Sequence, residues 1–220
     1  MYIIIAGIGV VGSQVTKTLV EHKHDVIAID LDRNACETMY EETGVTSIYG
    51  SATDIKVLNN AGSDKADIMV CLMRNDSDNI AATLIAKSLG IPKVIACLRK
   101  PGYENAYNAA GVDGLIQLPH LLLNNIIVEI EQPEVKKLID ITNNISVFAL
   151  KMLSEKNSGK TIKEISTING FPEKCIFLGI FKEDKNDFKI PRGKNIVKKN
   201  DTIFLISNQD DVKKVLKILR

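Results

Sequence analysis

The sequence lacks tryptophan, has only four cysteines and carries no large excess of either charge. The cysteines are widely spaced and form no C-x-x-C pair, which argues against a disulfide framework or a zinc site. We therefore expect reduced, mostly buried thiols at Cys36, Cys71, Cys97 and Cys175. The formal net charge of +1 argues against a nucleic-acid partner, because nucleic-acid-binding surfaces are strongly basic.

The sequence also lacks the signals of a membrane or secreted protein. No apolar run approaches the ~20 residues that a membrane-spanning helix needs. No basic segment precedes the first apolar run, which begins at Tyr2, so a signal peptide is not indicated. We therefore expect a cytoplasmic protein.

The length and the hydrophobic content are those of an ordinary globular protein. Its 220 residues, of which 45% are hydrophobic, suffice for one large domain or two small ones.

Apolar runs alternate with amphipathic segments over the first half of the chain. Continuous apolar runs bounded by glycine or aspartate are typical of strands buried on both faces of a parallel sheet. This alternation predicts an α/β fold with a doubly wound parallel sheet. The expected strands cover residues 2–8, 25–32, 45–49, 67–73, 93–100 and 113–118, and the expected helices 11–22, 34–44, 55–66, 76–90 and 103–112.

The pattern changes after Pro119. Residues 120–132 read "HLLLNNIIVEIEQ" and are apolar over much more than one helical stripe, so we expect a helix buried on two sides, between two subunits. A seventh strand or a core helix of the same domain is the alternative. From about residue 146 the pattern indicates a small α+β domain. We place one domain at 1–132 and the second at 133–220, with the change over 133–144.

The segment "GIGVVG" directly follows the first apolar run. Gly7 permits a tight turn, Gly9 lets a phosphate approach the backbone, and Gly12 lets the next helix pack on the strand. The helix N-terminus then favours an anion. Asp30 lies 18 positions beyond the last glycine, where a carboxylate can bind ribose hydroxyls and repel a 2′-phosphate. The context predicts a site for NAD or an adenosine nucleotide.

Residues that could perform chemistry are sparse. His22 and His24 lie in a predicted turn, and no G-x-S-x-G, H-E-x-x-H or Walker lysine is present. The pattern therefore favours a nucleotide-binding protein that is not an enzyme. A small NAD-dependent oxidoreductase, which would use the same glycine loop, is the alternative.

The order of "MYIIIAGIGVVG", "HDVIAIDLD", "YGSATD", "AGSDKADIMVCLMRNDSDNIAATLIAKSLGI" and "AGVDGLIQLP" resembles the regulatory subunits of Trk/Ktr-type potassium transporters, the RCK proteins. "SGKTIKEI" and "PRGKNIVKKNDTIFLIS" resemble the family's second module. The resemblance implies a Rossmann-like domain that binds NAD(H), ADP or ATP as a regulatory ligand. It also implies dimers formed around the helix at 120–132, assembly into an octameric ring, and gating of a membrane potassium transporter or channel.

The resemblance also implies which residues bind the nucleotide, with no metal and no catalytic residue. The implied site comprises Gly7, Ile8, Gly9, Val10, Val11, Gly12, Asp30, Leu31, Ala52, Thr53, Met73, Asn79 and Arg99. Three positions depart from the family pattern, namely Val10, Ser51 and Cys97, and two of them replace arginine. Arg99 stands one strand period beyond Cys97, where its charge could substitute.

Overall fold

The computed structural model describes residues 1–131, 133–142 and 144–220, and the side chains of these residues except those at 120–122, 124 and 125. The chain forms two compact units, Met1–Leu121 and Leu122–Arg220. Each unit has its own sheet and its own buried core. The predicted domain boundary after residue 132 falls beside Gln132, which lies outside the described residues, and it stays a prediction.

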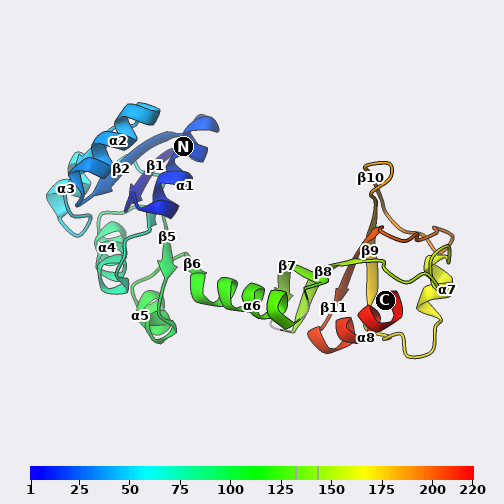
Figure 1. The fold of residues 1–220 in the computed structure, drawn as a ribbon. Coiled ribbons are helices and arrows are strands. Elements are labelled where there is room, and N and C mark those ends of the chain that lie inside the picture. The colour runs from blue at the N-terminus through cyan, green and yellow to red at the C-terminus, as the bar shows by residue number, and fades with distance from the viewer. Residues whose placement is uncertain (132, 143) are drawn as a thin grey trace. The chain divides into compact units, whose positions relative to one another are not determined.

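The first unit is built on a six-stranded sheet with the strand order β3-β2-β1-β4-β5-β6 (Figure 1). Its strands are β1 (Tyr2–Ala6), β2 (Asp25–Asp30), β3 (Ser47–Tyr49), β4 (Ile68–Cys71), β5 (Lys93–Leu98) and β6 (Gly114–Gln117). Neighbouring strands all pair in parallel. The predicted doubly wound, Rossmann-like sheet is thus confirmed, because its strand order is the one typical of that fold.

Helices follow the strands as the alternating pattern predicted. They are α1 (Val10–Glu21), α2 (Arg33–Thr43), α3 (Ile55–Asn60), α4 (Asp76–Ser88), the short 3-10 helix η1 (Pro101–Tyr103) and α5 (Glu104–Ala109). Two aspartates start helices by accepting backbone N–H groups: Asp32 caps α2 and Asp54 caps α3. The apolar faces of the helices cover both sides of the sheet, giving two clusters of buried side chains.

The position of β1 determines where a ligand can bind. β1 lies between β2 and β4, and the chain order reverses at this point of the sheet. In open parallel sheets, ligands bind beyond the carboxyl ends of the strands at such a reversal. The loops after β1, β2 and β4 meet there.

The apolar segment after β6 is a helix, α6 (Leu118–Glu131), and not a seventh strand. Val128 is buried in the core of the second unit. Other apolar side chains of α6 are exposed within one chain, among them Leu123, Ile126, Ile127 and Ile130. The side chains of Leu121 and Leu122, which belong to the same apolar run, lie outside the described residues.

The second unit is the predicted small α+β domain. Its antiparallel sheet has the order β10-β9-β11-β8-β7. The elements are β7 (Val135–Thr142), β8 (Ile145–Lys151), α7 (Ile162–Ser166), β9 (Ile176–Lys182), β10 (Asp187–Lys189), β11 (Thr202–Ser207) and α8 (Gln209–Leu219). Thr161 and Glu164 form a reciprocal capping box that starts α7. Val212, Val215 and Leu219 form the buried face of α8.

Strand β7 was missing from the sequence-based expectation, which placed a domain boundary there. Only Val135 among the eight residues of β7 is buried. Because β7 is an edge strand, its sequence does not alternate cleanly between buried and exposed positions. With one buried position, the segment lacks the apolar pattern of a strand and therefore fell within the predicted domain boundary at 133–144.

The four cysteines are buried free thiols. Burial raises the pKa of Cys71 to about 12 and that of Cys175 to about 11. Such thiols stay protonated and unreactive near neutral pH, as buried structural cysteines do. Over the described residues, no helix is both long enough and apolar enough to cross a membrane.

Asp113 joins three parts of the first unit and makes its stability depend on pH. Its carboxylate accepts the Val94 N–H at 2.6 Å and pairs with Lys87 at 2.6 Å. The hydrogen bond from Lys87 is the main cause of the lowered pKa of Asp113. A lowered pKa in the folded state adds stability above the unfolded pKa of about 4, and this stability disappears as the pH falls through the folded pKa.

We therefore expect Asp113→Ala to lower the free energy of unfolding by about 0.5–1 kcal/mol at neutral pH, a figure kept small by solvent screening of this exposed pair. In acid, as the pH falls through the folded pKa of Asp113, the difference should shrink. Urea unfolding of the wild type and of Asp113→Ala, each at neutral and at acid pH, measures this difference in the free energy of unfolding. An equal loss at both pH values would show that the charge of Asp113 contributes nothing.

Candidate functional site

A cavity of about 790 Å³ lies at the reversal point of the first sheet, beyond the carboxyl ends of β1, β2 and β4. This volume is in the range typical of small-molecule sites. The lining residues are Gly7, Ile8, Gly9, Val10, Val11, Gly12, Ile29, Asp30, Leu31, Asp32, Arg33, Ala35, Tyr49, Gly50, Ala52, Leu72, Met73, Arg74, Asn75, Asp78 and Arg99.

The glycine loop forms one wall of the cavity because its three glycines meet three different demands. Gly7 adopts a φ of +100°, which favours glycine, and its N–H donates to the Ile29 carbonyl at 2.8 Å. A Cβ on Gly12 would lie 1.8 Å from the Gly7 oxygen, so the start of α1 can approach β1 only with glycine there. A Cβ on Gly9 would meet no atom within 4 Å, so the space beside Gly9 is open.

The N-terminus of α1 faces this open space without a competing acceptor. Gly9 makes no side-chain cap, and the first turn of α1 contains no acidic residue. No described side chain accepts the first N–H groups of the helix, so these groups are available to an anion. Val10, the first residue of the helix, is 91% exposed and lines the cavity, and its apolar side chain contributes no charge there.

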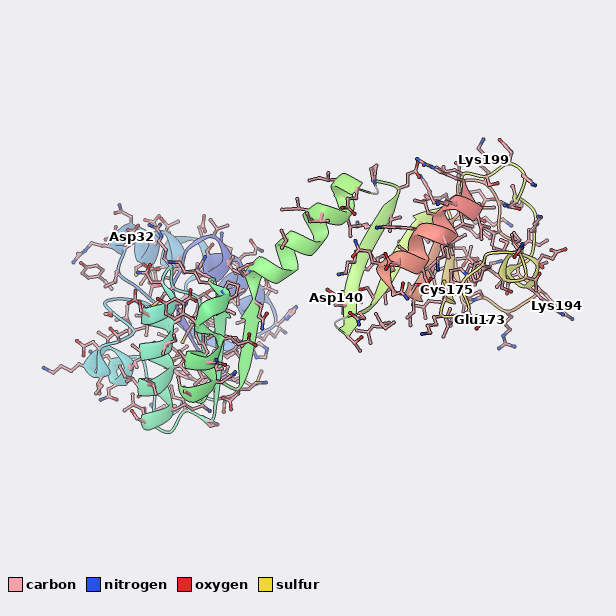
Figure 2. The ribbon with its side chains drawn as sticks, turned by 90° about the horizontal axis from the view of Figure 1, so that it is seen from below. Asp32, Asp140, Glu173, Cys175, Lys194 and Lys199 are labelled. Carbon is pink, nitrogen blue, oxygen red and sulfur yellow. The ribbon has the colours of Figure 1, made fainter. Side chains whose placement is uncertain are left out.

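Asp30 lies beside the glycine loop at the end of β2 and is held by two backbone donors. Its Oδ2 accepts the N–H of Ile8 at 2.5 Å and its Oδ1 accepts the N–H of Asp32 at 2.9 Å. Asp32, labelled in Figure 2, caps α2, and its Oδ1 accepts the N–H groups of Asn34 and Ala35. Each oxygen of Asp30 keeps acceptor capacity for a ligand hydroxyl.

The opposite wall comes from the loops after β4 and β5. Asn79 is fully buried; its Oδ1 accepts the Met73 N–H at 2.9 Å and its Nδ2 donates to the Met73 carbonyl at 3.1 Å. The Arg99 Nε donates to the Met73 carbonyl at 3.0 Å, and Asp76 accepts the Arg99 N–H at 2.9 Å. The Tyr107 hydroxyl also donates to Asp76, at 2.9 Å. This network fixes the backbone on which Arg99 stands.

The cavity brings together eleven of the residues predicted from sequence and leaves out two. Thr53 does not line it; its hydroxyl lies 2.7 Å from the Ser51 hydroxyl. Asn79 does not line the cavity either, because its side chain is buried and hydrogen-bonded to the backbone of Met73. Arg99 does line the cavity, but part of its guanidinium is already bonded to the Met73 carbonyl.

Sequence reasoning missed two basic residues of the cavity. Arg33 lies over the Tyr49 ring, with 5.0 Å between its Cζ and the ring centroid. Arg74 is exposed in the loop after β4, and no ion pair or hydrogen bond joins its side chain to another described residue. The signal that could have found Arg74 is its place just after a predicted parallel strand.

The family model of the TrkA-N domain matches residues 3–118 and that of the TrkA-C domain matches residues 154–220. The chain therefore belongs to the TrkA-N domain family, with a TrkA-C domain following. This finding confirms the resemblance noted in the sequence.

Two relatives are each named Trk system potassium uptake protein TrkA homolog. The relative from Methanothermobacter thermautotrophicus is 27% identical over 97% of this chain and 96% of its own length. The relative from Archaeoglobus fulgidus is 30% identical over 96% of this chain but only 48% of its own length. The chain thus spans nearly all of one relative and about half of the other.

A solved structure described as the GsuK channel bound to NAD has a similar fold. It matches 100% of this chain and 39% of that chain with a TM-score of 0.67 and 18% sequence identity. At this identity the likeness shows the fold alone.

The glycine loop yields a matched pair of variants. Gly12→Ala should lower the free energy of unfolding by about 1–3 kcal/mol or more, because the new Cβ overlaps the Gly7 carbonyl. Gly9→Ala should leave stability nearly unchanged, since its Cβ enters open space and its φ of −65° suits alanine. Thermal unfolding compares the two. Equal stability of both variants would contradict the close approach of α1 to β1.

Proposed function

We propose that this chain binds an adenine nucleotide, NAD(H) or ADP/ATP, in the glycine-loop cavity as a regulatory ligand, and that binding gates a membrane potassium transporter or channel. The observation that carries the proposal is the pairing of the open helix N-terminus with Asp30 across one cavity. The relatives named as potassium uptake proteins and the NAD-bound structure of similar fold supply the expected context.

The cavity suits a ligand with a ribose at one end and phosphates at the other. Asp30 would accept from the ribose hydroxyls and disfavour a 2′-phosphate. The phosphates would lie at the start of α1 beside Gly9, where the backbone is open. Arg74 and the free donors of Arg99 would supply the positive charge that Val10 does not. The exposed ring of Tyr49 would lie near the adenine.

The composition of the cavity supports binding more than catalysis. Its described lining contains no histidine, cysteine, lysine, serine or threonine. Each of its three carboxylates already accepts at least one hydrogen bond: Asp30 and Asp32 accept backbone N–H groups, and Asp78 accepts the Asn75 amide at 2.9 Å. A dehydrogenase needs an acid or base beside the nicotinamide. We therefore propose a sensor in preference to the oxidoreductase that uses the same loop.

One pair of variants tests how the ligand is oriented. Asp30→Ala should weaken adenosine and ADP alike by about 1–3 kcal/mol, the cost of losing hydrogen bonds to a charged group. Arg74→Gln should weaken ADP but leave adenosine unchanged, because only ADP carries phosphate. Calorimetry measures both affinities, and Asp64→Ala, an exposed aspartate outside the cavity, is the control.

The proposal fails at this point if Asp30→Ala binds both ligands as the wild type does. In its host, Asp30→Ala should also change potassium uptake, whereas Asp64→Ala should not. Altered binding with unchanged uptake would retain the nucleotide site and remove the gating role.

We also propose that a second copy of the chain covers α6, as in a dimer from which a ring can assemble. Four exposed apolar side chains recur at positions i, i+3, i+4 and i+7 of this helix, which places them on one face. They are Leu123, Ile126, Ile127 and Ile130, with exposures of 58%, 54%, 40% and 72%. A contiguous apolar face of this kind marks an interaction site, and a helix can pair with its own copy about a two-fold axis.

The dimer proposal predicts that Ile126→Glu gives monomers, because a carboxylate cannot be buried unpaired between two helices. Ile126→Leu should stay dimeric. Leu84→Glu, which changes a 52% exposed leucine on α4, controls for added charge. Light scattering after size-exclusion chromatography measures the mass. A wild type that remains monomeric at high concentration would refute the interface.

A further inference from the structure

The two units of this nearly neutral chain carry opposite charge. The first unit, Met1–Leu121, contains 10 lysines and arginines and 14 aspartates and glutamates. The second unit, Leu122–Arg220, contains 18 lysines and arginines and 13 aspartates and glutamates. Part of this excess lies in residues 188–200, which include five basic residues and no acidic one. Charge asymmetry of this kind indicates an anionic partner for the second unit.

Residues 190–198 lie alongside residues 159–163, and we call these two segments together the basic ribbon. An antiparallel bridge joins Thr161 to Ile196. The backbone N–H groups that donate between the two segments are those of Gly159 to the Val197 carbonyl at 2.8 Å, Val197 to Lys160 at 2.9 Å, Ile162 to Asn195 at 2.9 Å and Lys163 to Gly193 at 3.1 Å. The ribbon is therefore a defined surface and not a loose run of charge.

One side of the ribbon packs on the core and the other faces solvent. Ile162 and Val197 are buried in the core of the second unit. Successive side chains of an extended segment point to opposite sides, and Ile196, next to Val197, is 47% exposed. Lys194 and Lys198, two residues to either side of Ile196, are exposed as well. Figure 2 shows Lys194 at the periphery of the second unit.

The exposed cations of the ribbon are Lys163, Arg192, Lys194 and Lys198. Within the part of the chain that the structure describes, the side chain of none of the four forms an ion pair or a hydrogen bond. Their charge is therefore available to an anionic partner.

The carboxylates next to the ribbon already have partners. Asp201 is 3% exposed and pairs with Lys182. Glu155 pairs with Lys199, which follows the ribbon directly. Glu164 accepts the backbone N–H at the start of α7 at 2.7 Å. These carboxylates leave the four exposed cations without a counterion from the described residues.

Large apolar side chains stand among these cations. Ile190 is 78% exposed and lies two residues before Arg192, and Ile196 lies between Lys194 and Lys198. Exposed apolar groups interspersed with basic ones are typical of a surface that enters the boundary between lipid headgroups and acyl chains. The ribbon contains no aromatic residue on which a nucleic-acid base could stack. This composition favours a lipid bilayer over a nucleic acid.

We propose that the basic ribbon docks the second unit on an anionic lipid bilayer. Its four cations would lie at the level of the lipid phosphates, and Ile190 and Ile196 would enter the headgroup boundary. Lysine binds phosphate as a point charge, so a plane of mobile headgroups suffices and no enclosed pocket is needed. Binding should weaken as salt is added, because salt screens exposed charges. The proposal does not depend on what the glycine-loop cavity binds.

The test is co-sedimentation of the full-length chain with lipid vesicles. Vesicles of phosphatidylcholine with about one quarter phosphatidylglycerol should bind the chain at low salt, and vesicles of phosphatidylcholine alone should not. Raising sodium chloride from about 50 to 500 mM should release the chain. Inorganic phosphate at matched ionic strength should release no more than chloride does. Selective release by phosphate would reveal a site for the free ion and overturn the docking proposal.

The double variant Arg192→Gln/Lys194→Gln should bind anionic vesicles roughly twentyfold more weakly than the wild type, since each basic group near the surface contributes to binding. Lys213→Gln/Lys217→Gln removes the same charge from exposed positions on α8 and should bind as the wild type does. Ile190→Asn should weaken binding at every salt concentration, because its contribution is apolar. Thermal unfolding checks that each variant folds.

Three results would overturn the proposal. The first is a wild type that fails to sediment with anionic vesicles, and the second is equal binding to neutral ones. The third is an equal effect of the ribbon double variant and the α8 double variant, which would show that overall charge and not this surface attracts the chain.

Discussion

The close approach of Gly12 to the carbonyl of Gly7 is the constraint on which the first unit depends. Only at this separation does α1 start directly over the end of β1, with its free N–H groups directed into the cavity. The same turn places the Ile8 N–H where Asp30 accepts it, so the two halves of the cavity hold one another in place. A ligand that bridges the helix end and Asp30 would complete a site that already exists. Little reorganisation would then be needed for binding.

The parallel sheet and the glycine loop could be predicted from the sequence because each imposes local requirements on residue type. Each buried parallel strand needs a continuous apolar run, and the glycine turn needs glycine at fixed offsets. The sequence does not indicate side-chain orientations that depend on tertiary contacts. The pattern indicated neither that Asn79 turns inward to hold Met73 nor that Arg74, beside the cavity, has no side-chain partner in the described part of the chain. Strand β7 was missed because an edge strand needs few buried residues.

Charge illustrates the same limit on a larger scale. A net charge of +1 describes the chain as a whole, whereas three arginines and three aspartates line the glycine-loop cavity, and the side chain of Arg74 has no partner among the described residues. The electrostatic potential in a cavity depends on which charged side chains lack partners. Their pairing is determined by the fold and not by the composition. The nearly neutral total still argues against a general nucleic-acid surface.

The proposed regulation requires that the glycine-loop cavity holds an adenine nucleotide. The most direct measurement is to purify the protein, denature it and identify the released small molecules by mass. We expect NAD(H), ADP or ATP at close to one molecule per chain. Where purification removes the nucleotide, we expect saturable binding when it is added back. Release of no adenine nucleotide, together with no binding of any of them at millimolar concentration, would contradict it.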